Sequence, residues 1–302
     1  MEKKKILILG INGFIGRAVL KYINRINNEY HFIYVDQKKN RSINKNFFKV
    51  NLLKIDKLKH ILKKEKPDHI LDLVGINYSR DITDLYKVNH FTKINLYEAV
   101  LSVGNYSPRI LIIGSAAEYG EVKSKDLPVK ESSPCEPITH YGISKLSATH
   151  TALAYNKNHN MKIIIARPFN LLGPHLGEKL SISSFIKQLK EMRNKSRVLK
   201  VGNIETKRDF LHVEDAVDAI FKILLKGKPS DIYNICSGRS IKIRKIIMTL
   251  TELLGMEKIR IAVQKERIKK GDVKNIYGDN RKLKKIGWKP QHDLNKALSD
   301  MI

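Results

Sequence analysis

Three glycines, spaced as G-x-x-G-x-x-G, directly follow a short apolar run near the start of the chain. Residues 5–9 predict a buried strand, and residues 14–26 have apolar side chains at helical spacing. A chain that turns through Gly10, Gly13 and Gly16 into a helix can approach a pyrophosphate closely, and the helix N-terminus offers free N–H groups to it. In this strand–turn–helix context the pattern favours a dinucleotide-binding α/β fold over a tight turn without a ligand.

The alternation of short apolar runs and longer amphipathic stretches continues along the first half of the chain. It predicts a parallel, doubly wound sheet (a Rossmann-type α/β fold) with helices on both faces. After Pro168 the rhythm becomes irregular, which predicts a smaller, discontinuous substrate-binding lobe. We expect the cofactor domain to comprise residues 1–168 and 209–238, and the lobe to comprise residues 169–208 and 239–302. Further predicted strands are 31–35, 69–74, 109–113, 162–166, 198–203 and 231–235, and further helices are 58–62, 85–101, 141–158, 213–225 and 241–254.

An acidic residue, Asp36, ends the second predicted strand, about 20 residues beyond the last glycine of the turn. A carboxylate at this place accepts hydrogen bonds from an adenosine ribose and disfavours a 2′-phosphate, which favours NAD. Arg17, Lys38, Lys39 and Arg41 are close in the sequence and supply positive charge for a 2′-phosphate. NAD and NADP therefore both remain open.

A tyrosine and a lysine four residues apart, Tyr141 and Lys145, stand at the start of the predicted helix 141–158. Side chains at i and i+4 share a helical face, so we expect the ammonium to lower the pKa of the phenol, which suits proton transfer. Ser115 follows the predicted strand 109–113, at the sheet edge where such folds bind ligands. These three residues are the candidate catalytic set. Asn89 lies within helix 85–101, either as part of the site or on an exposed face.

The charge of the chain is strongly positive, with 57 Lys and Arg against 30 Asp and Glu, a net charge of +27. This suggests nucleic acid first, but the cations are spread along the chain and no basic arm, zinc finger or ribonucleoprotein motif accompanies them. A nucleic-acid partner is therefore not expected. Three explanations of the charge remain, in this order: a solvated lysine-rich surface, attraction of a small anionic substrate, and binding of a polyanion.

Neither a membrane-spanning protein nor one held together by disulfides or a metal is expected from this composition. No apolar run approaches the roughly 18–20 residues that a membrane span needs. Cys135 and Cys236 make neither a disulfide framework nor a metal site, which predicts a cytoplasmic protein without a bound metal.

Together these residues resemble the extended short-chain dehydrogenase/reductase family, the NAD-dependent epimerases and dehydratases, in the branch that acts on nucleotide sugars. The likeness runs over nearly the whole chain and includes residues 167–174, which are similar to the segment that opens the sugar-binding lobe. It implies NAD(H) or NADP(H) as cofactor, a nucleotide-diphosphate sugar as substrate, and a homodimer. The positions that it assigns to the cofactor are Gly10, Gly13, Phe14, Ile15, Gly16, Asp36, Asn51, Leu52, Asn89, Tyr141 and Lys145, and those that it assigns to the substrate are Asn170, Arg208, Arg267 and Lys269.

Within this branch, segments such as 114–120 and 233–238 are most similar to GDP-4-keto-6-deoxy-D-mannose reductases. The resemblance implies reduction of a nucleotide-linked 4-keto-6-deoxy sugar at C4, in nucleotide-sugar biosynthesis for surface polysaccharide. A sugar 4-epimerase that retains its NAD is the alternative.

A 4,6-dehydratase is less expected than a reductase. Dehydratases of the family place acidic residues one and two positions after the catalytic hydroxyl. This chain has Ala116 and Ala117 there, and neither can transfer a proton. Glu118, one residue further on, keeps dehydration open.

Overall fold

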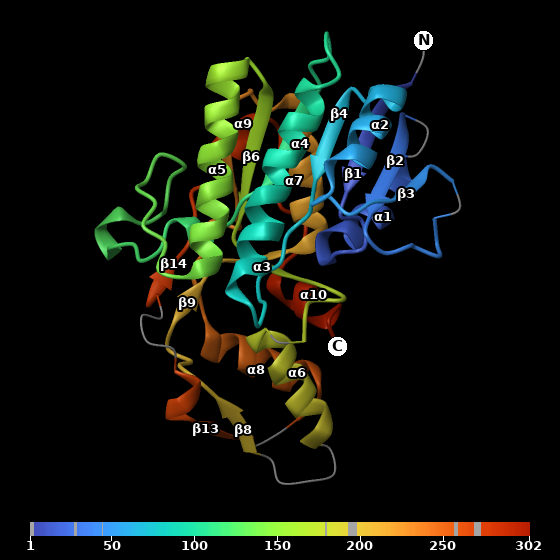
Figure 1. Cartoon of the computed structure of the whole chain (residues 1–302). Helices are drawn as coiled ribbons and strands as arrows, with labels where there is room; N and C mark the ends of the chain where they lie inside the picture. The colour runs from blue at the N-terminus through green and yellow to red at the C-terminus, as the bar shows by residue number, and fades with distance from the viewer. Residues whose placement is uncertain are drawn as a thin grey trace.

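A seven-stranded sheet, in the order β11-β6-β5-β4-β1-β2-β3, forms the centre of the computed structural model (Figure 1). The structure describes residues 3–26, 29–43, 45–178, 180–192, 198–256, 259–268 and 273–302. All strand pairs of this sheet are parallel, and the order reverses between β1 and β4, as in a doubly wound fold. The predicted fold class is thus confirmed. The strands are β1 (Lys4–Leu9), β2 (Tyr30–Asp36), β3 (Phe47–Lys49), β4 (His69–Asp72), β5 (Arg109–Ile113), β6 (Lys162–Pro168) and β11 (Ile232–Ile235).

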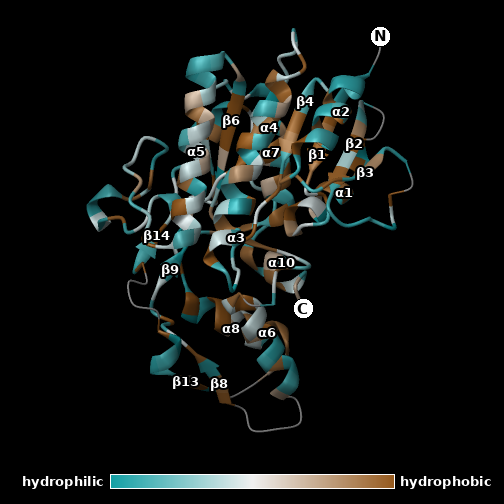
Figure 2. Cartoon of the chain, in the orientation of Figure 1, coloured by the Kyte–Doolittle hydropathy of each residue, from teal (hydrophilic) through white to brown (hydrophobic). Residues whose placement is uncertain are grey.

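Helices cover both faces of the sheet, and Figure 2 shows apolar strands between helices of mixed hydropathy. The reason is visible in β1, where Ile6 and Ile8 pack on one side and Leu7 and Leu9 on the other. Successive side chains of a strand point to opposite faces, so a continuous apolar run needs cover on both. One face packs against α1 (Phe14–Ile26) and α7 (Val213–Lys226), and the other against α2 (Ile55–Glu65), α4 (Thr92–Leu101) and α5 (His140–His159).

The prediction of one regular helix over residues 85–101 is wrong. The structure has a short helix α3 (Ile82–Tyr86), a π-helical turn (Lys87–Phe91) and then α4. A π-helical turn inserts an extra residue and rotates the faces of the helix that follows. Asn89 lies in this turn and is completely buried, which rules out the exposed face that the sequence left open.

A second lobe lies beyond the carboxyl ends of the sheet strands, below the sheet in Figure 1. Its core is formed by apolar side chains of three helices and a strand, among them Phe185, Leu199 and Leu250. The sequence did not predict α6, and the helix predicted from residue 241 begins at Ile243. The elements of this part of the chain are β7 (Asn170–Leu172), α6 (Ser181–Glu191), β8 (Val198–Val201), β9 (Lys207–Arg208), β10 (Phe210–His212), β12 (Ile241–Lys242), α8 (Ile243–Leu253), β13 (Arg260–Val263), β14 (Asn275–Ile276), α9 (Arg281–Lys285) and α10 (Leu294–Ser299).

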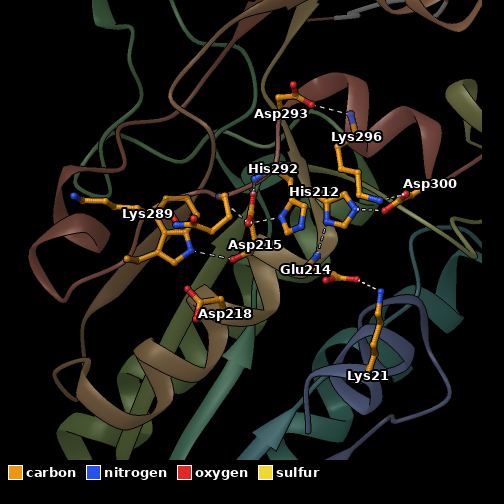
Figure 3. Close-up of polar contacts among 12 residues, drawn as sticks. Lys21, His212, Glu214, Asp215, Asp218, Lys289, His292, Asp293, Lys296 and Asp300 are labelled. Carbon is orange, nitrogen blue, oxygen red and sulfur yellow. Dashed lines mark hydrogen bonds and ion pairs between the residues drawn. The ribbon is translucent and has the colours of Figure 1, made fainter. Parts of the chain in front are cut away.

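The C-terminal segment returns to the start of α7, where Asp215 holds it (Figure 3). The buried Asp215 carboxylate accepts hydrogen bonds from the backbone N–H groups of Gln291 and His292, each at 3.0 Å. Trp288 donates from its indole nitrogen to the Asp215 carbonyl and packs, with Leu283, into the core beneath α1 and α7. The division into two domains stays a prediction, and these two apolar residues of the expected lobe belong to the core of the sheet.

Candidate active site

The glycine turn connects β1 to α1 with the tight geometry that its sequence predicts. A Cβ on Gly16 would lie 2.3 Å from the Ile11 carbonyl oxygen, so only glycine fits there. The turn is tied to β2, since the Gly10 N–H donates to the Val35 carbonyl at 2.9 Å. The Asp36 carboxylate accepts from the Asn12 N–H at 3.0 Å, which places an acid beside the turn. This cradle fits a dinucleotide, because backbone N–H groups, a helix N-terminus and a carboxylate lie together.

The remaining residues assigned to the cofactor lie on segments along the same edge. Phe14 and Ile15 form the first turn of α1 and are half-buried. Asn51 follows β3, and its side-chain oxygen accepts from the Leu53 N–H at 3.0 Å. Leu52 is buried, and its carbonyl accepts from the Asn95 side chain of α4 at 2.9 Å.

Ser115 begins a 3-10 turn (Ala116–Glu118) at the carboxyl end of β5. Its Oγ accepts from the Ala117 N–H at 3.1 Å, while the Glu118 carboxylate accepts from the Ser115 N–H at 2.8 Å. This reciprocal capping box holds the hydroxyl of Ser115 through one bond and its backbone N–H through the other. The Ser115 O–H can therefore point toward a ligand at the sheet edge.

Tyr141 is brought to Ser115 by the start of α5. Thr139 caps this helix by accepting from the Gly142 N–H at 3.1 Å, and the Tyr141 and Ser115 side chains are hydrogen-bonded. The pKa of Tyr141 is raised, because burial and the nearby Glu118 charge outweigh the hydrogen bond from Ser115. The predicted lowering by Lys145 is wrong for this structure. Its Nζ lies 6.0 Å from the Tyr141 ring centroid, and burial disfavours the phenolate.

Lys145 is buried one turn further along α5 and donates from Nζ to the Ile113 carbonyl of β5 at 2.9 Å. Burial lowers its pKa, and the charges of Asp72 and Glu118 act in the opposite direction. A Cβ on Gly75 would lie 2.8 Å from the Lys145 Nζ, so the segment after β4 packs directly against the ammonium. The site thus joins the ends of β4, β5 and α5.

Asn89 braces the same region from the π-helical turn. Its Oδ1 accepts from the Ile76 N–H at 2.8 Å, and its Nδ2 donates to the Ile76 carbonyl at 2.9 Å and to Ser144 Oγ at 3.0 Å. Ser144 directly precedes Lys145 in α5. Asn89 is therefore a positioning residue between the segment after β4 and the helix that carries the candidate catalytic pair.

Glu118 is the residue on which the dehydratase alternative depends, and it is completely buried. Its Oε2 accepts from Thr149 Oγ1 at 2.9 Å and pairs with Arg167 Nε at 2.7 Å. A Cβ on Gly114 would lie 2.3 Å from its Oε1, so glycine makes room for the carboxylate. A carboxylate that is paired and bonded on both oxygens is a poor proton shuttle, which weighs against dehydration.

The residues expected to bind substrate lie in the second half of the chain. Asn170 is exposed on β7 and donates from its side chain to the Asp209 carbonyl at 2.9 Å. Arg208 is half-buried on β9, directly before Asp209, so these two positions are neighbours. Arg267 is exposed and donates to the Lys200 carbonyl of β8 at 2.9 Å. Lys269 lies outside the described residues.

A methyl group at position 142 is expected to separate Tyr141 from Ser115. A Cβ on Gly142 would lie 2.5 Å from the Ala117 carbonyl oxygen, so α5 must move away from the Ser115 turn. Since a misplacement of about 1 Å can cost about 10²-fold, we expect Gly142→Ala to lower kcat at least about tenfold. Steady-state kinetics and thermal denaturation test this. Gly177→Ala is the control, because a Cβ there meets nothing within 4 Å, and unchanged kcat in Gly142→Ala would contradict the geometry.

The model of the family described as "NAD dependent epimerase/dehydratase family" matches residues 6–236. The chain belongs to this family. The resemblance noted from the sequence is thereby confirmed, and the glycine turn, Asp36 and the Ser115–Tyr141–Lys145 set all fall within the matched range.

Individual relatives agree with this assignment. The chain is 28% identical to GDP-6-deoxy-D-mannose reductase of Pseudomonas aeruginosa over 306 residues, covering 99% of this chain and 96% of the relative. It is 26% identical to GDP-6-deoxy-D-talose 4-dehydrogenase of Aggregatibacter actinomycetemcomitans, covering 92% and 90%. A solved structure of RMD from Pseudomonas aeruginosa complexed with NADPH is similar with a TM-score of 0.84 at 27% identity, covering 99% and 97%.

The described part of the chain has no helix long and apolar enough to cross a membrane. Across the same residues, no group of three or more His, Cys, Asp or Glu side chains is arranged to hold a metal ion.

Sequence reasoning missed several residues of this family member's site. Gly75 and Gly142 act only through close approach, which no spacing rule reveals. Lys93 and Asp72 form a buried ion pair next to Lys145. A signal for Lys93 exists, because it stands four residues after Asn89 in the predicted helix 85–101, and a regular helix would place both on one face.

Proposed function

We propose that this protein is an NAD(P)H-dependent reductase of a nucleotide-linked 4-keto-6-deoxy sugar, acting at C4. The observation that carries the proposal is the Tyr141 hydroxyl, which is hydrogen-bonded to Ser115 and stands on the same helix turn that brings the buried Lys145 to the end of β5. A phenol is protonated at neutral pH and can give its proton to the sugar oxygen, as reduction requires. The names of the two curated relatives, both enzymes of GDP-linked 6-deoxy sugars, support the substrate class.

The residues of the site have distinct roles in this reaction. The bound cofactor supplies the hydride that adds to C4 of the sugar. Ser115 donates a hydrogen bond to the carbonyl oxygen and stabilises the charge that develops there. Tyr141 delivers the proton to this oxygen, and Lys145 sustains the proton transfer by its positive charge. Asn89 keeps Lys145 and the segment after β4 in register.

Substrate binding is assigned to the second lobe. We propose that Arg208 and Arg267, with Lys269, neutralise the diphosphate, and that Asn170 bonds the sugar. Guanidinium groups suit this task, because they bind phosphate oxygens in pairs. Asn170 and Arg208 are held next to each other by Asp209, whose buried carboxylate accepts from the N–H groups of Ser237 and Gly238.

The reaction is tested by supplying NADPH or NADH with GDP-4-keto-6-deoxy-D-mannose, and with UDP- and dTDP-linked keto sugars. We expect oxidation of the cofactor in stoichiometric amounts with formation of a 4-hydroxy sugar. Interconversion of C4 epimers by the purified protein, with no net consumption of added cofactor, favours the 4-epimerase instead. Release of water from a GDP- or dTDP-hexose favours a dehydratase.

The protein is also proposed to form a homodimer through the outer faces of α4 and α5. Phe91 is 48% exposed, and Leu101 and Ile143 are each 38% exposed, beside a sheet that these helices already cover on their inner faces. We propose that these exposed side chains are covered by the same helices of a second copy of the chain. A cytoplasmic location and the lack of a nucleic-acid partner stay predictions from composition.

Phe91→Asp is expected to shift the protein from dimer to monomer, because an aspartate buried at a two-fold axis faces its own copy. Light scattering after size-exclusion chromatography measures the mass. Met248→Asp is the matched control, since Met248 is 55% exposed on α8 in the second lobe. A monomeric wild-type protein, or a dimeric Phe91→Asp variant, would contradict this interface.

A further inference from the structure

A second lysine is buried next to the candidate catalytic one. Lys93 of α4 pairs with Asp72 at the end of β4, with 2.9 Å between Nζ and Oδ2 and side chains 1% and 0% exposed. Removing two charges from water is costly, and apolar residues of similar size often stabilise such a position better. An ion pair at this place is therefore more readily explained by a task in the site than by stability.

The pair holds one segment of backbone, residues 73–76, from two sides. The Asp72 Oδ1 accepts from the Val74 N–H at 2.9 Å, and Lys93 Nζ donates to the Val74 carbonyl at 2.7 Å. Asn89 bonds the N–H and carbonyl of Ile76 in the same way. In Val74 and in Ile76, the backbone N–H and the carbonyl are thus both hydrogen-bonded to side chains rather than to a neighbouring strand.

This segment lies between the two parts of the site. A Cβ on Gly10 would lie 3.0 Å from the Val74 nitrogen, so the segment touches the phosphate turn. On its other side, Gly75 approaches the Lys145 ammonium, as described above. A displacement of residues 73–76 therefore moves either the pyrophosphate cradle or the lysine.

The charges of the pair act on Lys145 directly. Asp72 favours the charged form of Lys145, as Glu118 does from the other side, and Lys145 in turn lowers the pKa of Lys93. Three charged groups thus surround Lys145: Asp72, Glu118 and Lys93. Asp72 compensates two lysines at once.

We propose that the buried Asp72–Lys93 ion pair is a positioning device, which fixes residues 73–76 between the phosphate turn and Lys145. The task of Lys145 in this inference rests on the proposed function. The expected weakening of cofactor binding does not rest on the proposed function, because it follows from the contact of this segment with Gly10.

The first experiment separates positioning from stability. Lys93→Met leaves the buried Asp72 without its ion-pair partner, and we expect the Tm to fall by roughly 5–15 °C. The double variant Asp72→Leu/Lys93→Met removes both charges, and its Tm should recover toward the wild-type value. Its Kd for NADPH, measured by titration calorimetry without sugar, should nevertheless stay at least about tenfold weaker, because Val74 has lost both of its side-chain partners.

The comparison of Tm with Kd decides the outcome. If both the Tm and the Kd for NADPH return to their wild-type values in the double variant, the ion pair does not position the segment, and the proposal is overturned. Lys222→Met, which breaks the surface pair of Lys222 with Asp218 on α7, is the control and should change neither quantity.

The second experiment reads the charge on Lys145 without cofactor or substrate. Carbon-13 NMR of ε-labelled lysine gives the pKa of Lys145, with the signal assigned by its loss in Lys145→Arg. We expect Lys93→Met to raise this pKa and Asp72→Asn to lower it, because they remove neighbouring charges of opposite sign. If the pKa of Lys145 in both variants equals its wild-type value, the proposed electrostatic effect of the pair on Lys145 is overturned. Since neither readout uses turnover, a failure of the reductase assignment leaves both results interpretable.

Discussion

Replacing Tyr141 with phenylalanine is expected to lower kcat by about 10²–10⁴-fold, the usual contribution of a positioned proton donor. The ring stays in place, so the packing at the start of α5 is preserved and the Kd for NADPH should change little. Only the hydroxyl that bonds Ser115 is lost. Single-turnover reduction of the keto sugar, followed by cofactor absorbance, measures the effect on the chemical step.

Tyr155→Phe is the matched control for this variant. Tyr155 lies on the same helix, and its hydroxyl donates to Glu98 at 2.5 Å on the surface, away from Ser115. We expect wild-type kcat there. Wild-type turnover in Tyr141→Phe would remove Tyr141 from the mechanism and leave the proton donor unassigned.

Glu118→Gln is expected to have the second large effect, on both stability and pH dependence. The carboxylate receives donors on both oxygens, from Ser115 on one side and from Thr149 and Arg167 on the other. The glutamine amide must turn its NH₂ group toward one of these donors. It also carries no charge, so Arg167 loses its counter-charge. Breaking a buried ion pair in this way typically costs roughly 3–5 kcal/mol in the free energy of unfolding.

The pH dependence follows from the charge of Glu118, which raises the pKa of Tyr141. The reductase needs the protonated phenol, so its activity is lost as the pH rises through the Tyr141 pKa. Without the carboxylate this pKa is lower, and the alkaline limb of kcat/KM should move to lower pH. Denaturant unfolding and a pH–rate profile measure the two effects. Glu252→Gln, on the exposed surface of α8, should change neither. An alkaline limb that stays in place would show that Glu118 acts only in folding.

Much of the sheet could be predicted because its signals are local. Each buried strand is a continuous apolar run between glycine or polar turns, and the β5 bounds agree with the prediction. The same holds for α1, where apolar residues recur at helical spacing. Prediction was poorer for the second lobe, whose short strands β9, β12 and β14 pair with partners distant in the sequence. Such pairing has no local period.

The candidate site divides in the same way. The positions of Ser115 and Lys145 follow from strand ends and helical spacing, and the structure brings both to one edge of the sheet. The pKa of Tyr141 does not follow from spacing. The sequence places a lysine one turn away, but burial and Glu118 decide the direction of the shift.

The sequence by itself determined the fold class, the phosphate turn and the candidate proton-transfer set, because each depends on residues that are close along the chain. The tertiary structure alone decided the state of the charged groups. It buried Glu118 against Arg167, which weighs against dehydration, and it paired Lys93 with Asp72 behind Lys145. Electrostatic interactions depend on distance and burial in space, so partners from different elements are recognised only once the chain is folded.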